Sequence, residues 1–253
     1  MKITQLLFSP TGGTQKAADL LAHALSDSVQ TVDLCDSQAH FSEVSLASDD
    51  LALIAVPSYG GRVPAAAIQR LAAVHGNGAP AILMVVYGNR AFEDTMVELE
   101  DATKQAGFRI VAGVAAVAEH SIVREFAAGR PDAQDQAQLI AFAARIQEKL
   151  AAGHLTEPAI PGNRPYKKAG GTGMVPKPTK DCDSCGLCAK SCPVQAIDPN
   201  DPHKVDQHLC ISCMRCISVC PRHARKLNPL MLTAAHAMLK KVCSDRKENQ
   251  LFL

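Results

Sequence analysis

Eight of the ten cysteines in this 253-residue chain repeat one spacing. The first copy is Cys182, Cys185, Cys188 and Cys192, and the second is Cys210, Cys213, Cys216 and Cys220; a proline follows each copy. Thiolates at positions 1, 4 and 7 of a turn reach three corners of one iron–sulfur cubane, and the fourth cysteine leads away to another. The spacing predicts two [4Fe–4S] clusters, one on Cys182, Cys185, Cys188 and Cys220, the other on Cys210, Cys213, Cys216 and Cys192.

Structural zinc is the main alternative, because two C-x-x-C pairs 15–20 residues apart are typical of zinc ribbons. That scheme leaves four of the eight cysteines without a role and does not explain the repeated Cys-Pro. Disulfides are disfavoured in the reducing compartment that we expect for this chain. Cys35 and Cys243 lie outside the pattern and are interpreted as a buried apolar-like residue and an incidental thiol.

Three glycine-containing loops indicate a second kind of site, for a ligand with a phosphate and a planar ring. The first runs from Ser9 to Thr14 and offers hydroxyls, glycine N–H groups and a helix N-terminus, which suit a phosphate dianion. No lysine follows it as in a triphosphate-binding loop, and the GxGxxG spacing is absent. The candidate phosphate-binding residues are Ser9, Thr11, Gly12, Gly13 and Thr14; an ordinary glycine-rich turn is the alternative.

The second and third loops suit a planar ring. In the second loop, Ser58, Tyr59 and Gly60 place an aromatic side chain beside glycines, where it can lie flat on a ring. In the third loop, Gly88, Asn89 and Arg90 offer amide and guanidinium donors. An exposed turn and a solvated arginine are the alternatives for these two loops.

An alternating pattern positions these loops. Buried strands are predicted at 3–8, 29–34, 51–56, 81–87 and 109–118, and helices follow four of them, starting near Ala17, at 64–74, at 92–105 and at 133–152. This order predicts a doubly wound five-stranded parallel sheet, and the three loops then share the edge at which such sheets bind ligands.

Charge and cysteine divide the chain. Residues 1–155 carry 11 Lys+Arg and 17 Asp+Glu, whereas residues 156–253 carry 15 and 8. Domains are expected at 1–155 and 179–228, with a Pro- and Gly-rich linker at 156–178 and a helical tail at 229–253. The opposite charges, −6 and +7, predict that the halves dock electrostatically and that the linker permits their release.

The first half resembles a flavodoxin. Ser9-x-Thr11-Gly12-x-Thr14 is similar to the FMN-phosphate loop of that family, and the resemblance implies that Tyr59 stacks on the flavin while Gly60, Gly88 and Asn89 border its ring. The chain has no Trp to cover the ring's other face. The second half resembles a bacterial-type two-cluster ferredoxin, so the whole is similar to the flavodoxin–ferredoxin fusion family. His120 follows the last strand, where it could face the flavin edge and tune the flavin or pass a proton; a histidine with a purely structural role is the favoured alternative.

One FMN and two [4Fe–4S] clusters imply an electron-transfer protein that passes electrons between them and on to a partner enzyme. Two alternatives stay open: a self-contained flavin-dependent reductase of a small molecule such as a quinone, and a flavin-free scaffold fused to a ferredoxin. The net charge of +1 gives no reason to expect nucleic acid, no apolar run spans a bilayer, and no signal peptide is recognised, so a cytoplasmic protein is expected.

Overall fold

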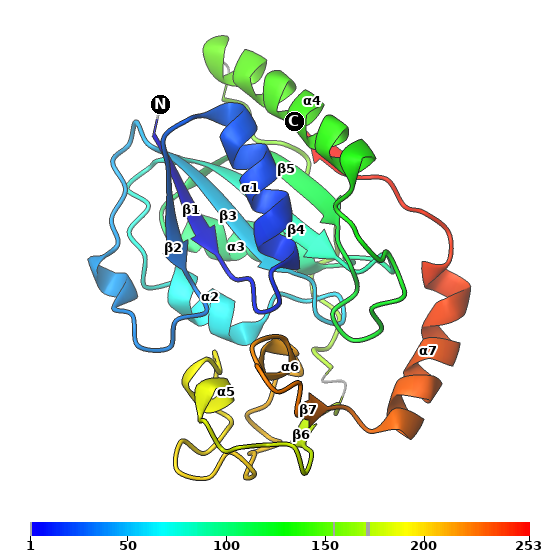
Figure 1. The fold of residues 1–253 in the computed structure, drawn as a ribbon. Coiled ribbons are helices and arrows are strands. Elements are labelled where there is room, and N and C mark those ends of the chain that lie inside the picture. Colours follow the sequence, from blue (N-terminus) through cyan, green and yellow to red (C-terminus); the bar gives the residue numbers. More distant parts are fainter. Residues whose placement is uncertain (1, 154, 171–172) are drawn as a thin grey trace.

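The computed structural model describes residues 2–153, 155–170 and 173–253 (Figure 1). Five parallel strands form the centre of its main sheet, namely β1 (Ile3–Leu7), β2 (Val29–Asp33), β3 (Leu51–Pro57), β4 (Pro80–Tyr87) and β5 (Arg109–Val117). They are ordered β2-β1-β3-β4-β5. This is the flavodoxin-like order of a doubly wound sheet, as the alternating pattern predicted. The middle strands are buried almost throughout, which explains their nearly continuous apolar sequences.

Helices cover both faces of the sheet. α1 (Gly13–Leu25) and α4 (Ala133–Ala151) pack on one face through one apolar cluster, and α2 (Ala65–Leu71) and α3 (Thr95–Gln105) pack on the other. A short 3-10 helix (Phe41–Glu43) lies in the region for which the sequence predicted no element. The two apolar clusters place the core above and below the sheet, and its carboxyl edge stays free for the loops.

A sixth strand corrects the five-stranded prediction. β8 (Gln250–Phe252) pairs antiparallel with β5, with Gly113 opposite Phe252. The tail therefore contains α7 (Pro229–Cys243) followed by a return of the chain into the first sheet. A three-residue edge strand has too short a pattern to be recognised in sequence, because only its long-range pairing with β5 defines it.

The cysteine-rich segment forms a small unit below the carboxyl edge of the sheet (Figure 1). Its elements are β6 (Lys177–Pro178), α5 (Leu187–Lys190), α6 (Arg215–Ser218) and β7 (Arg225–Lys226), and β6 pairs antiparallel with β7. An isolated antiparallel bridge joins Ile197 and Val205 in the same unit. Among the described residues, no helix is both long and apolar enough to cross a membrane.

The segment expected to be a releasable linker is fastened along α3. Arg164 forms ion pairs with Glu100 and Asp101 at 2.6 Å, and the Asp94 carboxylate accepts the backbone N–H groups of Asn163 and Lys167 at 2.9 and 2.8 Å. These hydrogen bonds hold the pKa of Asp94 below its usual range. The cysteine-rich unit is thus attached to the first sheet at both of its ends, through this segment and through β8.

Candidate functional site

The β1–α1 loop keeps a helix N-terminus open toward the carboxyl edge. Gly12, at φ +88°, occupies the N-cap position without a side-chain cap, and the first turn of α1 holds no acidic residue. The Ser9 hydroxyl instead accepts the N–H of Gln15 at 2.9 Å. Uncapped N–H groups at the positive end of a helix dipole suit an anionic group such as a phosphate.

A cavity of about 380 Å³ lies beside this loop. Thr11, Gly13 and Thr14 line it, so the structure brings three of the five predicted phosphate-loop residues to its wall; Ser9 and Gly12 are not among the lining residues. A Cβ atom at Gly13 would lie 3.3 Å from the Cβ of Ala118, which shows how closely the loop approaches the end of β5. The cavity therefore begins at an anion site and extends along the strand ends.

The second and third loops supply the next walls. Ser58, Tyr59 and Gly60 line the cavity after β3, and Gly88 and Arg90 line it after β4. Tyr59 sits in a tight turn closed by paired backbone hydrogen bonds with Arg62 at 3.0 and 3.2 Å. Burial raises the pKa of its phenol well above the ordinary value. A half-buried aromatic fixed at the wall of a cavity suits stacking on a planar ring.

Asn89 differs from its expected role. Its side chain is buried and points to the tail, where Nδ2 donates to the carbonyls of Cys243 and Asp245 at 2.7 and 2.8 Å, and Oδ1 accepts the N–H of Lys247 at 3.1 Å. It does not line the cavity. Its neighbour Arg90 does, and it pairs with Glu93 at 2.8 Å.

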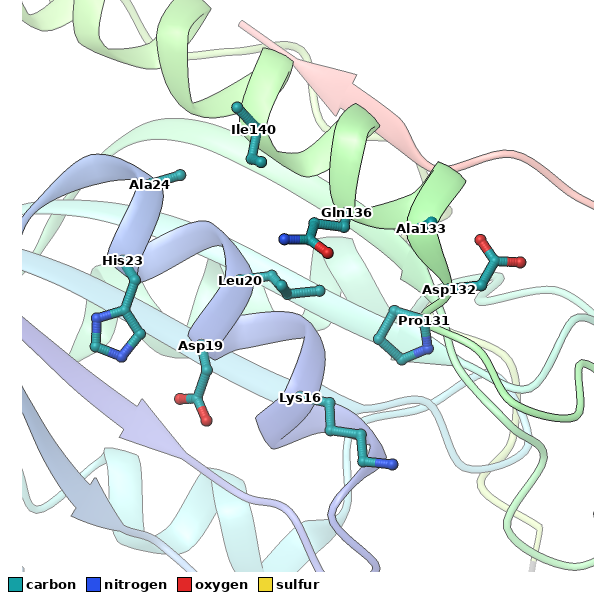
Figure 2. A pocket seen from close by; sticks show the side chains of 10 residues that line it. All are labelled: Lys16, Asp19, Leu20, His23, Ala24, Pro131, Asp132, Ala133, Gln136 and Ile140. Atoms are coloured by element: carbon teal, nitrogen blue, oxygen red, sulfur yellow. The ribbon is translucent and has the colours of Figure 1, made fainter.

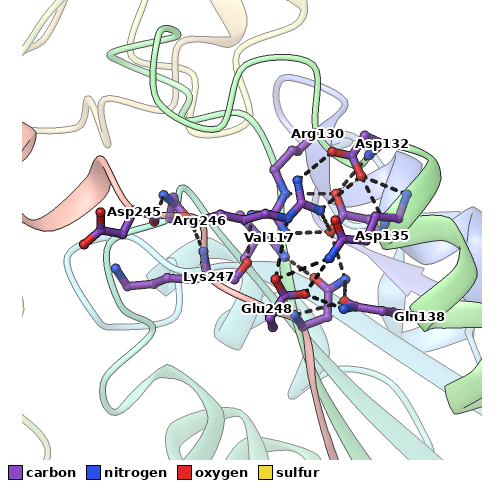
Figure 3. A network of polar contacts seen from close by, with 12 residues as sticks. Val117, Arg130, Asp132, Asp135, Gln138, Asp245, Arg246, Lys247 and Glu248 are labelled. Carbon is purple, nitrogen blue, oxygen red and sulfur yellow. Dashed lines mark hydrogen bonds and ion pairs between the residues drawn. The ribbon is translucent and has the colours of Figure 1, made fainter.

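A polar network holds the tail that Asn89 binds (Figure 3). The Asn249 side chain accepts the N–H of Val117 at 2.9 Å and donates to buried Asp135 at 3.0 Å; Arg130 and Arg246 also bind Asp135, at 2.5 and 3.3 Å. This network fixes the chain between α7 and β8. In consequence, three residues of α7 join the cavity wall, namely Ala235, Met238 and Leu239.

The far wall of the cavity comes from the second cysteine motif. Ile211 and Ser212, which lie between Cys210 and Cys213, line the cavity opposite the β-strand loops. Sequence analysis missed these residues and those of α7 as cavity residues, because local patterns do not reveal which loop of one unit faces another. Gly170 and Met174 complete this side.

The two cysteine motifs have matching backbones 28 positions apart (182 to 210 and 192 to 220). Positive φ recurs in three pairs: Ser184 and Ser212, Gly186 and Met214, Gln195 and His223. The fourth cysteine of each motif accepts an N–H four residues later at 3.3 Å, Cys192 from Ala196 and Cys220 from Ala224. Both motifs thus aim backbone donors at sulfur, as iron–sulfur ligands require.

Electrostatic interactions between the thiols indicate which cysteines lie near one another. Burial, with smaller contributions from the neighbouring thiols of Cys192 and Cys210, raises the pKa of Cys213 to about 12; Cys213, Cys210 and Cys188 act in the same direction on Cys216. Cys192 thus lies near Cys210 and Cys213, and Cys188 lies near Cys216. Buried thiols resist ionisation, so a metal that binds them must stabilise their thiolates.

The other set is placed by contacts between the ends of the unit. The Thr179 N–H donates to the Ala224 carbonyl at 2.7 Å, and Arg222 donates to Asp183 at 3.0 Å. These contacts set the turn that follows Cys220 beside the turn that holds Cys182. All ten cysteines are free thiols in the structure.

A second hollow lies between α1 and α4 (Figure 2). Leu20 and Ile140 give it an apolar floor, and Lys16, Asp19 and Asp132 stand at its sides. It contains none of the predicted site residues, so the cavity at the carboxyl edge remains the candidate site.

Fold and site together define the class of the chain: a flavodoxin-like α/β unit whose ligand edge faces a cysteine-rich iron–sulfur unit. Residues 181–224 match the family described as 4Fe-4S dicluster domain. The chain thus combines a flavodoxin-like strand order with a 4Fe-4S dicluster domain, which fits a flavodoxin–ferredoxin fusion.

One curated relative is a tetrathionate reductase subunit of Archaeoglobus fulgidus, 35% identical over 88 residues, which are 34% of this chain. The match spans about two fifths, 41%, of that relative's length. Among solved structures, a flavodoxin from the domain Archaea is 14% identical with a TM-score of 0.44, over 60% of this chain and 99% of its own.

Two further solved structures are similar to the first half. Flavodoxin 1 of Bacillus cereus is 14% identical with a TM-score of 0.42, over 58% of this chain and 98% of its own. The rubredoxin oxygen:oxidoreductase of Desulfovibrio gigas is 19% identical with a TM-score of 0.43, over 59% of this chain and 37% of its own. The strand order described above carries the fold assignment.

Proposed function

We propose that this chain is an electron carrier in which FMN occupies the cavity at the carboxyl edge and exchanges electrons with two [4Fe–4S] clusters, which pass them to a partner enzyme. A flavin takes one or two electrons and each cluster takes one, so the combination divides a two-electron event into single steps. The chain's own contribution is position, burial and hydrogen bonding.

The observation that carries this proposal is the far wall of the cavity. Ile211 and Ser212 line the cavity, and each is the chain neighbour of a cysteine predicted to hold a cluster. Ile211 and Ser212 are therefore shared between the cavity wall and the second cysteine motif.

Two arginines hold the units together beside this wall. Arg70 of α2 donates to the carbonyls of Leu34, at 2.5 Å, and Pro193. From the other side, Arg215 donates to the Ser9 carbonyl at 3.4 Å and lies 3.9 Å from the Asp33 carboxylate. With both ends of the cysteine-rich unit also fastened, we infer electron transfer within a fixed arrangement, in place of docking and release.

The arrangement gives the two clusters different roles. The set of Cys192, Cys210, Cys213 and Cys216 would hold the inner cluster, next to the cavity. The remaining set, Cys182, Cys185, Cys188 and Cys220, would hold the outer cluster. Cys185 of this set is exposed, and Leu187, two residues further along the chain, is 40% exposed. We infer that the partner exchanges electrons at this outer end.

Anaerobic purification tests the proposal. We expect about eight iron atoms and one FMN per chain, and reduction of the flavin followed by transfer to a cluster at a rate that is independent of protein concentration and little changed by salt. Thr11→Glu should abolish FMN retention by placing a carboxylate at the phosphate site, while the iron content stays unchanged. Thr156→Glu, at an exposed position outside both sites, is the matched control.

Three outcomes would overturn it. Flavin-free material with full iron content supports the scaffold alternative, and rapid turnover of a quinone with NAD(P)H supports the reductase alternative. Transfer that is second order in protein, or strongly slowed by salt, contradicts the fixed arrangement.

A further inference from the structure

His120 is placed by β5 at the cavity and packs on Gly88. His120 lies three residues beyond the end of β5, and the side of the cavity near it is lined by both His120 and Gly88. A Cβ atom at Gly88 would lie 2.6 Å from Cδ2 of His120. Glycine at position 88 therefore leaves the space that the imidazole ring occupies, and the ring cannot move toward β4.

Backbone hydrogen bonds fix which ring nitrogen carries the hydrogen. Nδ1 accepts the N–H groups of Ile122 and Val123 at 3.2 and 3.1 Å, and the His120 N–H donates to the Phe126 carbonyl at 3.0 Å. A nitrogen that accepts two N–H groups bears no hydrogen of its own. The neutral ring must then be protonated at Nε2.

The surroundings keep this ring neutral. Burial lowers the pKa of His120, and the nearby positive charge of Arg90 lowers it further. The other charged neighbour, Glu119, is bound by Arg124 and accepts the Gly129 N–H at 3.3 Å. His120 thus stands at the cavity wall as a fixed, uncharged donor.

We propose that His120 is a flavin-binding residue whose Nε2–H donates to an acceptor atom of the isoalloxazine ring. This inference rests on the proposed function. An N–H donor binds an acceptor more strongly as the acceptor gains negative charge. The ring acceptors become richer in electrons on reduction, so His120 favours the reduced flavin and raises its reduction potential.

Two substitutions at His120 separate the effect of the N–H donor from the effect of the shape of the ring. His120→Phe keeps a planar ring without a donor, and His120→Gln keeps an N–H donor. We expect His120→Phe to weaken binding of reduced FMN about tenfold more than binding of oxidised FMN, which lowers the two-electron potential by about 30 mV. His120→Gln should restore most of this difference. His23→Phe, at an exposed position of α1, is the matched control.

Histidine ¹⁵N NMR of the oxidised protein gives a readout that does not depend on turnover, and it should place the hydrogen on Nε2. A hydrogen on Nδ1 would overturn the inference. So would a potential that does not change in His120→Phe, or equal weakening of both redox states. FMN binding by the wild type with any of these results refutes the inference alone, whereas a wild type that binds no FMN refutes it together with the proposed function.

Discussion

The Arg70 guanidinium donates to the carbonyl of Pro193, the residue that follows Cys192, a predicted cluster ligand. The same side chain donates to the Leu34 carbonyl at the end of β2. One arginine of α2 therefore holds the end of β2 and the turn after Cys192 together. Burial lowers its pKa, yet the guanidinium stays charged at any physiological pH.

Removing this clamp should loosen the cysteine-rich unit. For Arg70→Ala we expect a loss of about 2 kcal/mol, seen as bleaching of the cluster absorbance at a temperature roughly 4–8 °C lower. Arg109→Ala, which removes an exposed contact to the Gly78 carbonyl, should change stability by less than about 0.5 kcal/mol. Equal effects of the two substitutions would show that Arg70 has no special role at this interface.

Cys35 gives a chemical test of whether the two units separate. Its side chain is 3% exposed, and Cys213 and Arg215 of the other unit lie close enough to act on its charge. Burial raises the pKa of the thiol to about 12. Ordinary cysteine has a pKa of about 8.5, so the thiolate fraction at pH 8 should fall by roughly a thousandfold.

We therefore expect iodoacetamide to label Cys35 at pH 8 only after unfolding, as peptide mass spectrometry would report. Since the pKa is raised in the folded state, the stability that this thiol contributes is complete below about pH 8.5 and is lost as the pH rises toward 12. Cys35→Ser distinguishes its labelling from that of Cys243. Rapid labelling of the native protein would mean that the cysteine-rich unit separates from the first unit and exposes Cys35.

The helices and strands could be predicted from sequence because their signals are local, and the two cysteine motifs are local signals too. The spacing of the cysteines lies within two short segments, and the strands are continuous apolar runs. Tyr59 and Gly88 were likewise assigned to the cavity from their positions after predicted strands. In each case the chemistry and the element that positions it are neighbours in the chain.

The rest depends on contacts between distant residues. The partners of Asn89 are 154 to 158 positions away, and Pro193 is 123 positions from Arg70. Nothing near Asn89 in sequence distinguishes an amide that faces a flavin from one that holds the tail. The wall formed by Ile211 required the placement of one unit against the other, which no local pattern contains.

Asn89→Ala tests whether this amide anchors the tail. The substitution leaves two carbonyls and one N–H without their partner, which should cost about 2–4 kcal/mol. We expect proteases to cut the tail near residues 244–249 at lower temperature, and FMN to bind less tightly because α7 lines the cavity. The exposed Asn200→Ala provides a control.

The outcome distinguishes the two roles of Asn89. Weaker FMN binding with unchanged protease resistance of the tail would support the expectation from sequence, in which the Asn89 amide borders the flavin ring. Weaker FMN binding together with tail cleavage supports the observed contacts.

Cys192→Ser and Cys220→Ser form a matched pair that separates the inner and outer clusters. Each removes one ligand, and each should lower the iron content from about eight to about four atoms, or to seven where a three-iron cluster persists. Because Cys192 lies with Cys210 and Cys213, its loss should stop fast flavin-to-cluster transfer. Cys220→Ser should keep that transfer and lose only delivery to an external acceptor such as cytochrome c. Rapid-freeze EPR can follow the transfer kinetics in both variants. Identical kinetics would contradict the placement of the inner cluster beside the cavity.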